Sequence, residues 1–286
     1  MYRACYRTYV HVFTATRVVW FFISLQTRND KSMATRHFKS LTQTCSVQKF
    51  GTERFCDAAS IAVKTGNVCI AYRVGGVLHM REHKCAFKHA YGFVVTSNGA
   101  IISVHNNELY DGTKPPLTLP AFSCIQHAVH ENAALFTDIR RTKAVVLDLR
   151  TSEVLNAYVF DDIVWFTGFG RSPKHTLYAF IGCVMYVCCK DDTPRAVALP
   201  NRFDLAGMVE LINGDVLLIQ RTKTGFSILH WPYYADNIST VAIHDVFIRD
   251  AFPSAPVAVT YDYEMLYVFT CADMMLRTFL VSYYAY

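Results

Sequence analysis

Residues 133–160 read AALFTDI-RRT-KAVVLDL-RTSE-VLNAYVF, which is three apolar segments separated by two short polar turns. Segments of this length, rich in Val, Leu, Phe and Tyr and bounded by charged or polar residues, are typical of β-strands. The stretch therefore predicts three antiparallel strands within 28 residues.

The same pairing of two apolar segments across a tight turn recurs five times between Gly92 and the C-terminus. The pairs are Gly92–Asn98 with Ala100–His105, Ala133–Ile139 with Lys143–Leu149, Thr176–Gly182 with Cys183–Cys189, Asp215–Gln220 with Gly225–Trp231, and Met265–Thr270 with Met274–Val281. The centres of the second segments lie 43, 40, 42 and 49 residues apart. A strand pattern that recurs every ~40–50 residues is typical of propeller blades, whereas sandwich strands recur every ~8–12 residues without a longer period.

We therefore predict an all-β propeller of five to seven blades, and six fits best if Cys56–Cys85 forms one. The expected division is a basic, partly apolar N-terminal extension at residues 1–45 and a propeller domain at residues 46–286. Because a propeller closes by joining its first and last sheets, we expect the C-terminal strand to pair with a strand from residues 46–64.

One unit also resembles a known repeat. Lys143–Leu155 is similar to the third and fourth strands of a WD40 repeat, with Leu147 at the position of the family's Trp and Asp148 at its Asp. In the fifth unit Trp231 supplies an aromatic residue, and Pro232 stands in place of the Asp. The other units match only by spacing. The resemblance implies a degenerate WD40-like propeller that binds other proteins and has no catalytic role.

Positive charge is concentrated at the N-terminus. Of the 28 Lys and Arg residues, eight lie in residues 1–50 beside a single acid, Asp30, so the rest of the chain carries 20 basic and 22 acidic residues. A near-neutral body does not attract a phosphate backbone, which needs clustered Lys and Arg. We therefore expect no nucleic-acid binding by the main domain.

The N-terminal segment contains the apolar run Val18–Leu25, which is shorter than the 18–20 residues of a membrane span. The interpretations of residues 1–32 that stay open are an extension ahead of an internal start at Met33, a poorly packed tail, a targeting signal, and an integral part of the fold. Membrane contact is expected only through this segment, as a partial anchor.

The ten cysteines are too sparse for a disulfide scaffold, and several lie in apolar strands, as Cys69, Cys183 and Cys188 do. We interpret the thiols as reduced and expect a cytoplasmic or nuclear protein.

Four residues of types that bind metal ions are clustered in the sequence: His79, His83, Cys85 and His89. Imidazole and thiolate suit zinc, but on an extended strand these residues spread over more than ~30 Å and converge only around a turn. Polar residues at a strand end are the favoured interpretation, so we assign no metal and no cofactor.

Signatures of catalysis are missing from the sequence. It has no nucleophile elbow, P-loop or dinucleotide fingerprint, and the acidic pairs Asp161–Asp162 and Asp191–Asp192 fall at expected turns. The alternative to a scaffold is a propeller enzyme of the lactonase or glycoside-cleaving type, which needs several Asp, Glu or His side chains in the central channel.

The remaining candidate is the aromatic segment that contains Trp231, Tyr233 and Tyr234. Exposed aromatic residues are typical anchors of protein interfaces, although an aromatic residue in this position also serves to cap a core. These three residues are the candidate protein-interaction site.

Overall fold

The structure is a computed structural model in which part of the chain is described. The described residues are 10–14, 17–19, 38–64, 66–80, 83–88, 92–96, 99–105, 108–110, 117–118, 124–130, 133–138, 140–148, 151, 153–168, 170, 175–189, 194–200, 203–233, 235–236, 238, 242–247, 255–262 and 264–284.

Strands make up all of the regular structure in these residues, which confirms the expectation of an all-β chain. They form six sheets. Five of the sheets have four strands, and the remaining sheet has four consecutive strands extended by two more. Sheet 1 contains β4 (Ala58–Lys64), β5 (Asn67–Val74), β6 (Val77–Met80) and β7 (His83–Lys88). Sheet 2 contains β8 (Gly92–Val95), β9 (Ile101–His105), β10 (Glu108–Tyr110) and β11 (Leu117–Thr118). Sheet 3 contains β12 (Cys124–His130), β13 (Ala133–Thr137), β14 (Lys143–Asp148) and β15 (Val154–Phe160), extended by β1 (Val10–Thr14) and β2 (Arg17–Val19).

The other three sheets come from the C-terminal half and from one early strand. Sheet 4 contains β16 (Val164–Gly168), β17 (His175–Ile181), β18 (Val184–Cys189) and β19 (Arg195–Ala198). Sheet 5 contains β20 (Leu205–Glu210), β21 (Val216–Thr222), β22 (Gly225–Trp231) and β23 (Ala242–Phe247). Sheet 6 contains β24 (Val257–Asp262), β25 (Met265–Thr270), β26 (Met275–Tyr283) and β3 (Phe38–Lys49).

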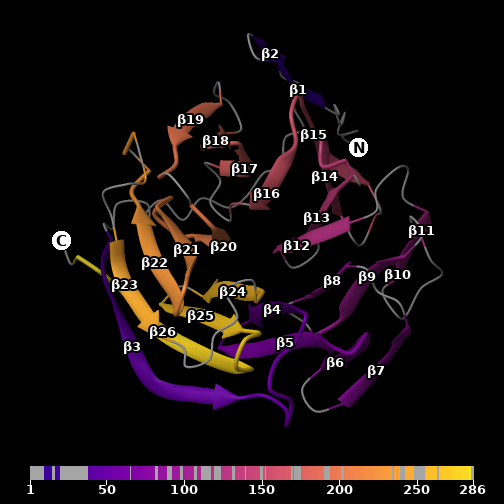
Figure 1. Ribbon diagram of the computed structural model, residues 1–286. Coiled ribbons are helices and arrows are strands. Elements are labelled where there is room, and N and C mark those ends of the chain that lie inside the picture. The colour runs from indigo at the N-terminus through magenta and orange to yellow at the C-terminus, as the bar shows by residue number, and fades with distance from the viewer. Residues whose placement is uncertain are drawn as a thin grey trace, which may run out of the picture.

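The sheets are arranged around a common centre, with the first strand of each sheet nearest to it (Figure 1). These inner strands contact one another in sequence order around most of the ring: β4 with β8, β8 with β12, β16 with β20, and β20 with β24. β24 also contacts β4, so the last sheet lies against the first.

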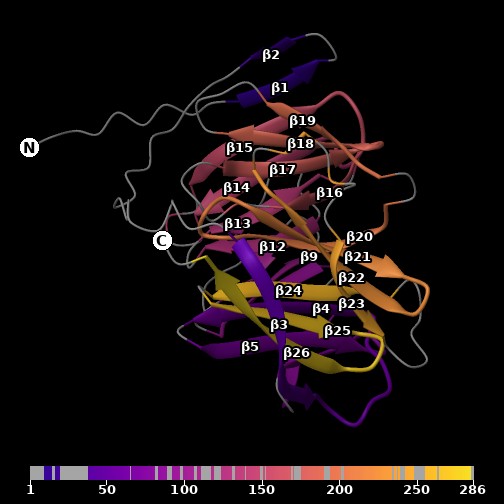
Figure 2. The same cartoon turned by 90° about the vertical axis from the view of Figure 1, so that its left-hand side faces the viewer.

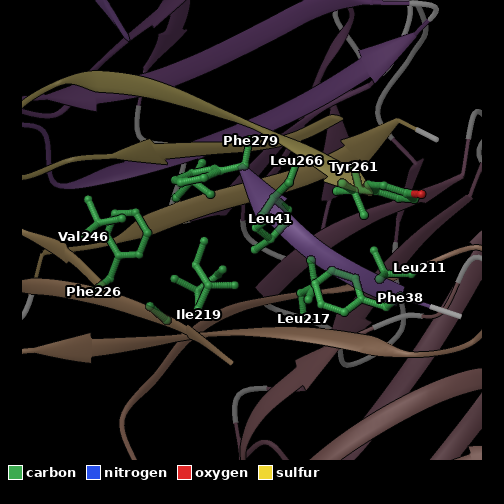
Figure 3. Close-up of a cluster of buried hydrophobic side chains, with 14 residues drawn as sticks. Phe38, Leu41, Leu211, Leu217, Ile219, Phe226, Val246, Tyr261, Leu266 and Phe279 are labelled. Atoms are coloured by element: carbon green, nitrogen blue, oxygen red, sulfur yellow. The ribbon is translucent and has the colours of Figure 1, made fainter. Parts of the chain in front are cut away.

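Apolar side chains fill the spaces between neighbouring sheets. Separate buried clusters join sheets 1 and 2, 3 and 4, 4 and 5, and 5 and 6, and another joins sheet 6 to sheet 1. Figure 3 shows the cluster between sheets 5 and 6, where Leu217 and Ile219 of β21 face Leu266 of β25. Sheets 1, 4, 5 and 6 therefore have a buried cluster on each face, which explains why a strand such as β21 is almost continuously apolar.

The five predicted strand pairs are confirmed, with shifts of a few residues at their ends. Four of them are the second and third strands of sheets 3 to 6, whereas Gly92–Asn98 with Ala100–His105 supplies the first and second strands of sheet 2. The proposed first unit is a complete four-stranded sheet between residues 58 and 88.

The predicted partner of the C-terminal strand was largely wrong. β26 pairs with β3, from Met275 opposite Lys49 to Tyr283 opposite Phe38, so most of the partner strand precedes the expected range of residues 46–64. The expected domain boundary at residue 46 falls within β3. β3 belongs to the domain because Phe38 and Leu41 are buried in the cluster between sheets 5 and 6 (Figure 3).

A shorter segment of the N-terminal extension also joins a sheet. β1 pairs in parallel with β15, from Val10 opposite Ala157 to Phe13 opposite Phe160, and β2 pairs with β1. The two strands lie at the outer rim of sheet 3 (Figures 1 and 2). Part of residues 1–32 therefore contributes to the fold, and Trp20–Leu25 lie outside the described residues.

Two glycines allow the inner strands of neighbouring sheets to approach closely. A Cβ atom on Gly168 of β16 would lie 2.0 Å from Sδ of Met208 on β20. A Cβ atom on Gly207 of β20 would lie 2.8 Å from Cγ1 of Val259 on β24. Because real Cβ contacts are ordinarily longer than 3.4 Å, the packing of sheets 4, 5 and 6 near the centre depends on glycine at both positions.

Candidate interaction site

The predicted aromatic segment begins at the end of β22. The β20–β21 turn lies at the same end of the strands of sheet 5. In an antiparallel meander the first and third connections lie at the same end of the strands. The β20–β21 turn, which contains Asp215, therefore lies beside the residues that follow Trp231. The start of β19 in sheet 4 occupies the equivalent edge, which brings Arg195 to the same place. We call residues 232–236 the aromatic loop.

Trp231 lies in the core and is not an exposed anchor. Its exposed fraction is 0%, and it belongs to the cluster between sheets 4 and 5 together with Tyr178 and Met185. Its Nε1 donates a hydrogen bond to the Ala235 carbonyl oxygen at 3.1 Å. The core-capping alternative is therefore the one that holds for Trp231, because its indole fills the space between two sheets while its N–H group is satisfied locally.

Tyr233 is half-buried and stands beside Trp231. The two rings meet edge to face, with centroids 6.2 Å apart. The backbone N–H of Tyr233 donates to Oδ1 of Asp215 at 3.1 Å, which fixes the main chain of the loop to the β20–β21 turn. Tyr234, the third residue of the predicted site, lies outside the described residues.

Arg195 of β19 connects the aromatic loop to sheet 4. Its guanidinium donates hydrogen bonds to the carbonyl oxygens of Tyr233 and Ala235 and, at 3.1 Å, to Oδ1 of Asp236. It also lies 5.5 Å from the ring centroid of Trp231 and 5.8 Å from that of Tyr233. The Asp236 side chain is 98% exposed, so this ion pair contributes little. The two carbonyl contacts and the ring contacts therefore hold the loop.

Asp215 is the second residue that supports the loop. It is buried, and its Oδ2 lies 2.9 Å from Nε2 of His230 and accepts a hydrogen bond from Nδ2 of Asn213 at 2.8 Å. Burial alone would raise the pKa of Asp215, but the hydrogen bonds from His230 and the Tyr233 backbone, with the charge of His230, hold that pKa below its ordinary value. The carboxylate is therefore ionised near neutral pH and available to fix the loop.

The arrangement holds a short loop in one conformation at the surface. A loop whose main chain is held by two sheets loses little conformational entropy when a partner binds. It presents the accessible part of the Tyr233 ring and the exposed carboxylate of Asp236. Tyrosine offers a large contact area with few rotatable bonds, which favours its use at interfaces.

Of the four candidate metal ligands in the sequence, only the side chain of His79 is described. His79 stacks on the ring of Tyr72, with centroids 5.3 Å apart. The side chains of His83, Cys85 and His89 lie outside the described set, so their convergence stays untested. Among the side chains that are described, no three His, Cys, Asp or Glu residues form a group that could hold a metal ion.

The two acidic pairs were expected at turns. Asp161 and Asp162 are exposed in the connection between β15 and β16, where Oδ1 of Asp162 accepts a hydrogen bond from the N–H of Ile163 at 2.7 Å. Asp191 and Asp192 lie outside the described residues.

Within the described ranges, no helix is long and apolar enough to cross a membrane.

Sequence reasoning missed both residues that hold the aromatic loop. Asp215 follows the turn dipeptide Asn213-Gly214, and a buried acid after a turn has no distinguishing pattern in the sequence. Arg195 precedes Trp231 by 36 residues and belongs to another sheet. To predict the role of Arg195, one would have to know which strand ends of sheet 4 lie beside which strand ends of sheet 5.

Comparison with solved structures places the chain among β-propellers. It is similar to the crystal structure of Hsv2 from Kluyvelomyces marxianus, with a TM-score of 0.51, 10% identity, and 82% of this chain and 85% of that chain covered. It is also similar to the β-propeller domain of Cps50 (Swd1) from Myceliophteria thermophila, with a TM-score of 0.52, 9% identity, and 83% and 100% covered. No protein-family model and no curated protein sequence matches the chain. At these identities the similarity shows the fold, which confirms the predicted β-propeller.

Proposed function

We propose that the chain is a non-catalytic interaction scaffold of the WD40-like type, in which each of the six sheets is one blade. The proposed contact site for a partner protein is the aromatic loop, with Tyr233 as its apolar contact and Asp236 as its charged one. The observation that carries this proposal is the support of the loop from two sides, by Arg195 of sheet 4 and by Asp215 of sheet 5.

The arrangement of the sheets is consistent with a scaffold. The inner strands direct residues such as Gly168 and Gly207 into close contact with their neighbours, which is a packing role. No observation in the described ranges favours the alternative of a lactonase-like or glycoside-cleaving enzyme. Such an enzyme needs acids or histidines that converge on one point of the channel.

The charge distribution supports two further parts of the proposal. The main domain, with 20 basic and 22 acidic residues after residue 50, is proposed to bind proteins and not nucleic acid. The N-terminal segment is proposed as the part of the chain through which any membrane contact is made, and the proposed compartment is the cytoplasm or nucleus. Cell fractionation of the full chain and of a form that lacks residues 1–32 tests both assignments.

The test of the site compares three forms of the full chain: wild type, Tyr233→Ala, and Tyr284→Ala. Tyr284 is a matched control because its side chain is 56% exposed and lies at the C-terminal end, on sheet 6. Each form is used for affinity capture from an extract of the source cells, followed by mass spectrometry. A captured protein is then purified and titrated against all three forms by calorimetry.

We expect the Tyr233→Ala form to bind that partner at least about 30-fold more weakly, since an interface anchor contributes about 2 kcal/mol or more. The Tyr284→Ala form should bind like the wild type. Circular dichroism and the urea midpoint show whether each variant is folded. Equal affinity of all three forms for every captured protein would remove the aromatic loop from the proposal.

A further inference from the structure

Two cysteines that are far apart in the sequence meet where the last sheet joins the first. Cys56 lies in the connection between β3 and β4, which leads from sheet 6 to sheet 1, and Cys271 follows β25 in sheet 6. The N–H of Cys56 donates to the carbonyl oxygen of Cys271 at 3.0 Å. This backbone hydrogen bond brings the main chains of the two cysteines together, which is the first requirement for a disulfide.

The two thiols contact each other in an apolar environment. The Cys271 thiol is hydrogen-bonded to Cys56, and the exposed fraction is 3% for Cys56 and 0% for Cys271. Both belong to the cluster between sheets 6 and 1, with Phe269 and Tyr72 among its members. The side chains are therefore held together by packing as well as by the backbone contact.

Neighbouring backbone bonds fix both residues. The N–H of Cys271 donates to the Pro256 carbonyl oxygen at 3.0 Å, and the N–H of Phe50 donates to the Met274 carbonyl oxygen at 2.9 Å. The N–H of Asp57 donates to the Arg73 carbonyl oxygen at 2.9 Å. The β3–β4 connection is thus attached to sheet 6 on one side of Cys56 and to sheet 1 on the other.

The closed structure protects the pair from oxidation. The hydrogen bond to Cys56 and burial both raise the pKa of Cys271, so the reactive thiolate is scarce while the connection is closed. Residues 52–55 of the same connection are exposed, next to the buried Cys56. We therefore expect an oxidant to reach the pair by local opening of this connection, which needs less free energy than global unfolding.

We propose that Cys56 and Cys271 form a reversible disulfide that fastens the β3–β4 connection to sheet 6 and so locks the ring closed. With glutathione disulfide as oxidant, one cysteine thiolate attacks a glutathione sulfur and releases one glutathione thiolate. The second cysteine thiolate then attacks the mixed disulfide and releases the other. The two thiol protons end on the two glutathiones, so the protein loses two electrons and glutathione disulfide gains them.

The cross-link joins residues that are 215 positions apart and closes a loop that contains most of the chain. Long closed loops remove much conformational entropy from the unfolded chain. A stabilisation of the usual size for a disulfide corresponds to a rise in Tm of about 3–7 °C for a chain of this length.

The test uses the native full chain in glutathione buffers of increasing oxidised fraction. Free thiols are blocked with iodoacetamide, and peptides are mapped by mass spectrometry before and after treatment with dithiothreitol. We expect a Cys56–Cys271 linked peptide that disappears on reduction. The oxidised protein should have the higher Tm.

Two variants separate this pair from general thiol oxidation. Cys56→Ala should abolish both the linked peptide and the rise in Tm. Cys183→Ala is the matched control, because Cys183 is exposed in another sheet, and it should preserve both. Mapping of the wild-type chain decides the question even if Cys56→Ala folds poorly. The proposal is overturned if Cys56 and Cys271 stay unlinked under conditions in which Cys183 becomes glutathionylated.

Discussion

The close contact between Gly168 and Met208 gives a direct test of how sheets 4 and 5 pack near the centre. In a Gly168→Ala variant the new Cβ atom would lie 2.0 Å from Sδ and 2.6 Å from Cγ of Met208. An ordinary contact is at least 3.4 Å, so the Met208 side chain must move by more than about 1.4 Å. Met208 is buried in the cluster between the two sheets, which leaves it little space for that movement.

Overpacking of this kind costs about 1–3 kcal/mol, and the flexibility of methionine places the expected loss near the middle of that range. We therefore expect Gly168→Ala to lower the free energy of unfolding by about 2 kcal/mol. The measurement is equilibrium unfolding in urea, followed by tryptophan fluorescence. Trp231 is a suitable probe because it is buried in the same cluster.

A second background shows whether the loss comes from this contact. Met208→Ala removes the atoms that clash, at its own cost of about 2–5 kcal/mol. In that background we expect the additional effect of Gly168→Ala to be smaller than about 0.5 kcal/mol, so the double-mutant cycle gives a coupling energy of more than 1 kcal/mol. An equal loss in both backgrounds would refute the packing of β16 against β20.

Three further substitutions test the polar contacts. Arg195→Lys keeps the charge but loses the planar fork, so it should lower the free energy of unfolding by about 1–2 kcal/mol and accelerate hydrogen exchange in the aromatic loop. Asp215→Asn should cost about 2 kcal/mol at pH 7 because it weakens a charged hydrogen bond with His230. The pKa of Asp215 is lowered in the folded wild type. The greater free energy of unfolding of the wild type should therefore be present above pH ~4 and should decrease as the pH falls further. Asp273→Ala should cost about 3 kcal/mol because it leaves the buried guanidinium of Arg277 without its carboxylate.

For each of these three predictions, one result would contradict the reasoning. Unchanged exchange in residues 232–236 of Arg195→Lys would mean that the fork does not hold the loop. A constant difference between wild type and Asp215→Asn from pH 7 to pH 2 would contradict the lowered pKa. A loss below about 1 kcal/mol for Asp273→Ala would show that Arg277 reaches solvent.

The sequence predicted the hairpins well because their determinants are local. Apolar alternation and turn residues such as Asn213-Gly214 lie within a few positions of the strands that they define, and Gly214 has the positive φ of 90° that such a turn requires. The recurrence near 40 residues then indicated a propeller without any information on contacts between the units.

Features that depend on contacts between residues far apart in the sequence could not be predicted from the sequence. β3 reads FKSLTQTCSVQK, which is too polar to stand out as a strand, and its partner β26 lies more than 225 residues later. Its role becomes visible only when Phe38 and Leu41 are seen against sheets 5 and 6. In the same way, an aromatic residue after a strand predicted either an interface or a core cap, and only the neighbouring sheet decided that Trp231 is core.

The central claim is that an early strand closes the ring by pairing with the last strand of the chain. Thr42 lies directly opposite Leu280 in this pairing, whereas Gln43 lies opposite Phe279. Side chains of neighbouring positions point to opposite faces of a sheet. The decisive measurement is therefore the rate of disulfide formation, mapped by mass spectrometry, in Thr42→Cys/Leu280→Cys and in Gln43→Cys/Leu280→Cys. The closed ring predicts rapid linkage in the first variant and little in the second, and linkage of the first pair no faster than the second would contradict it.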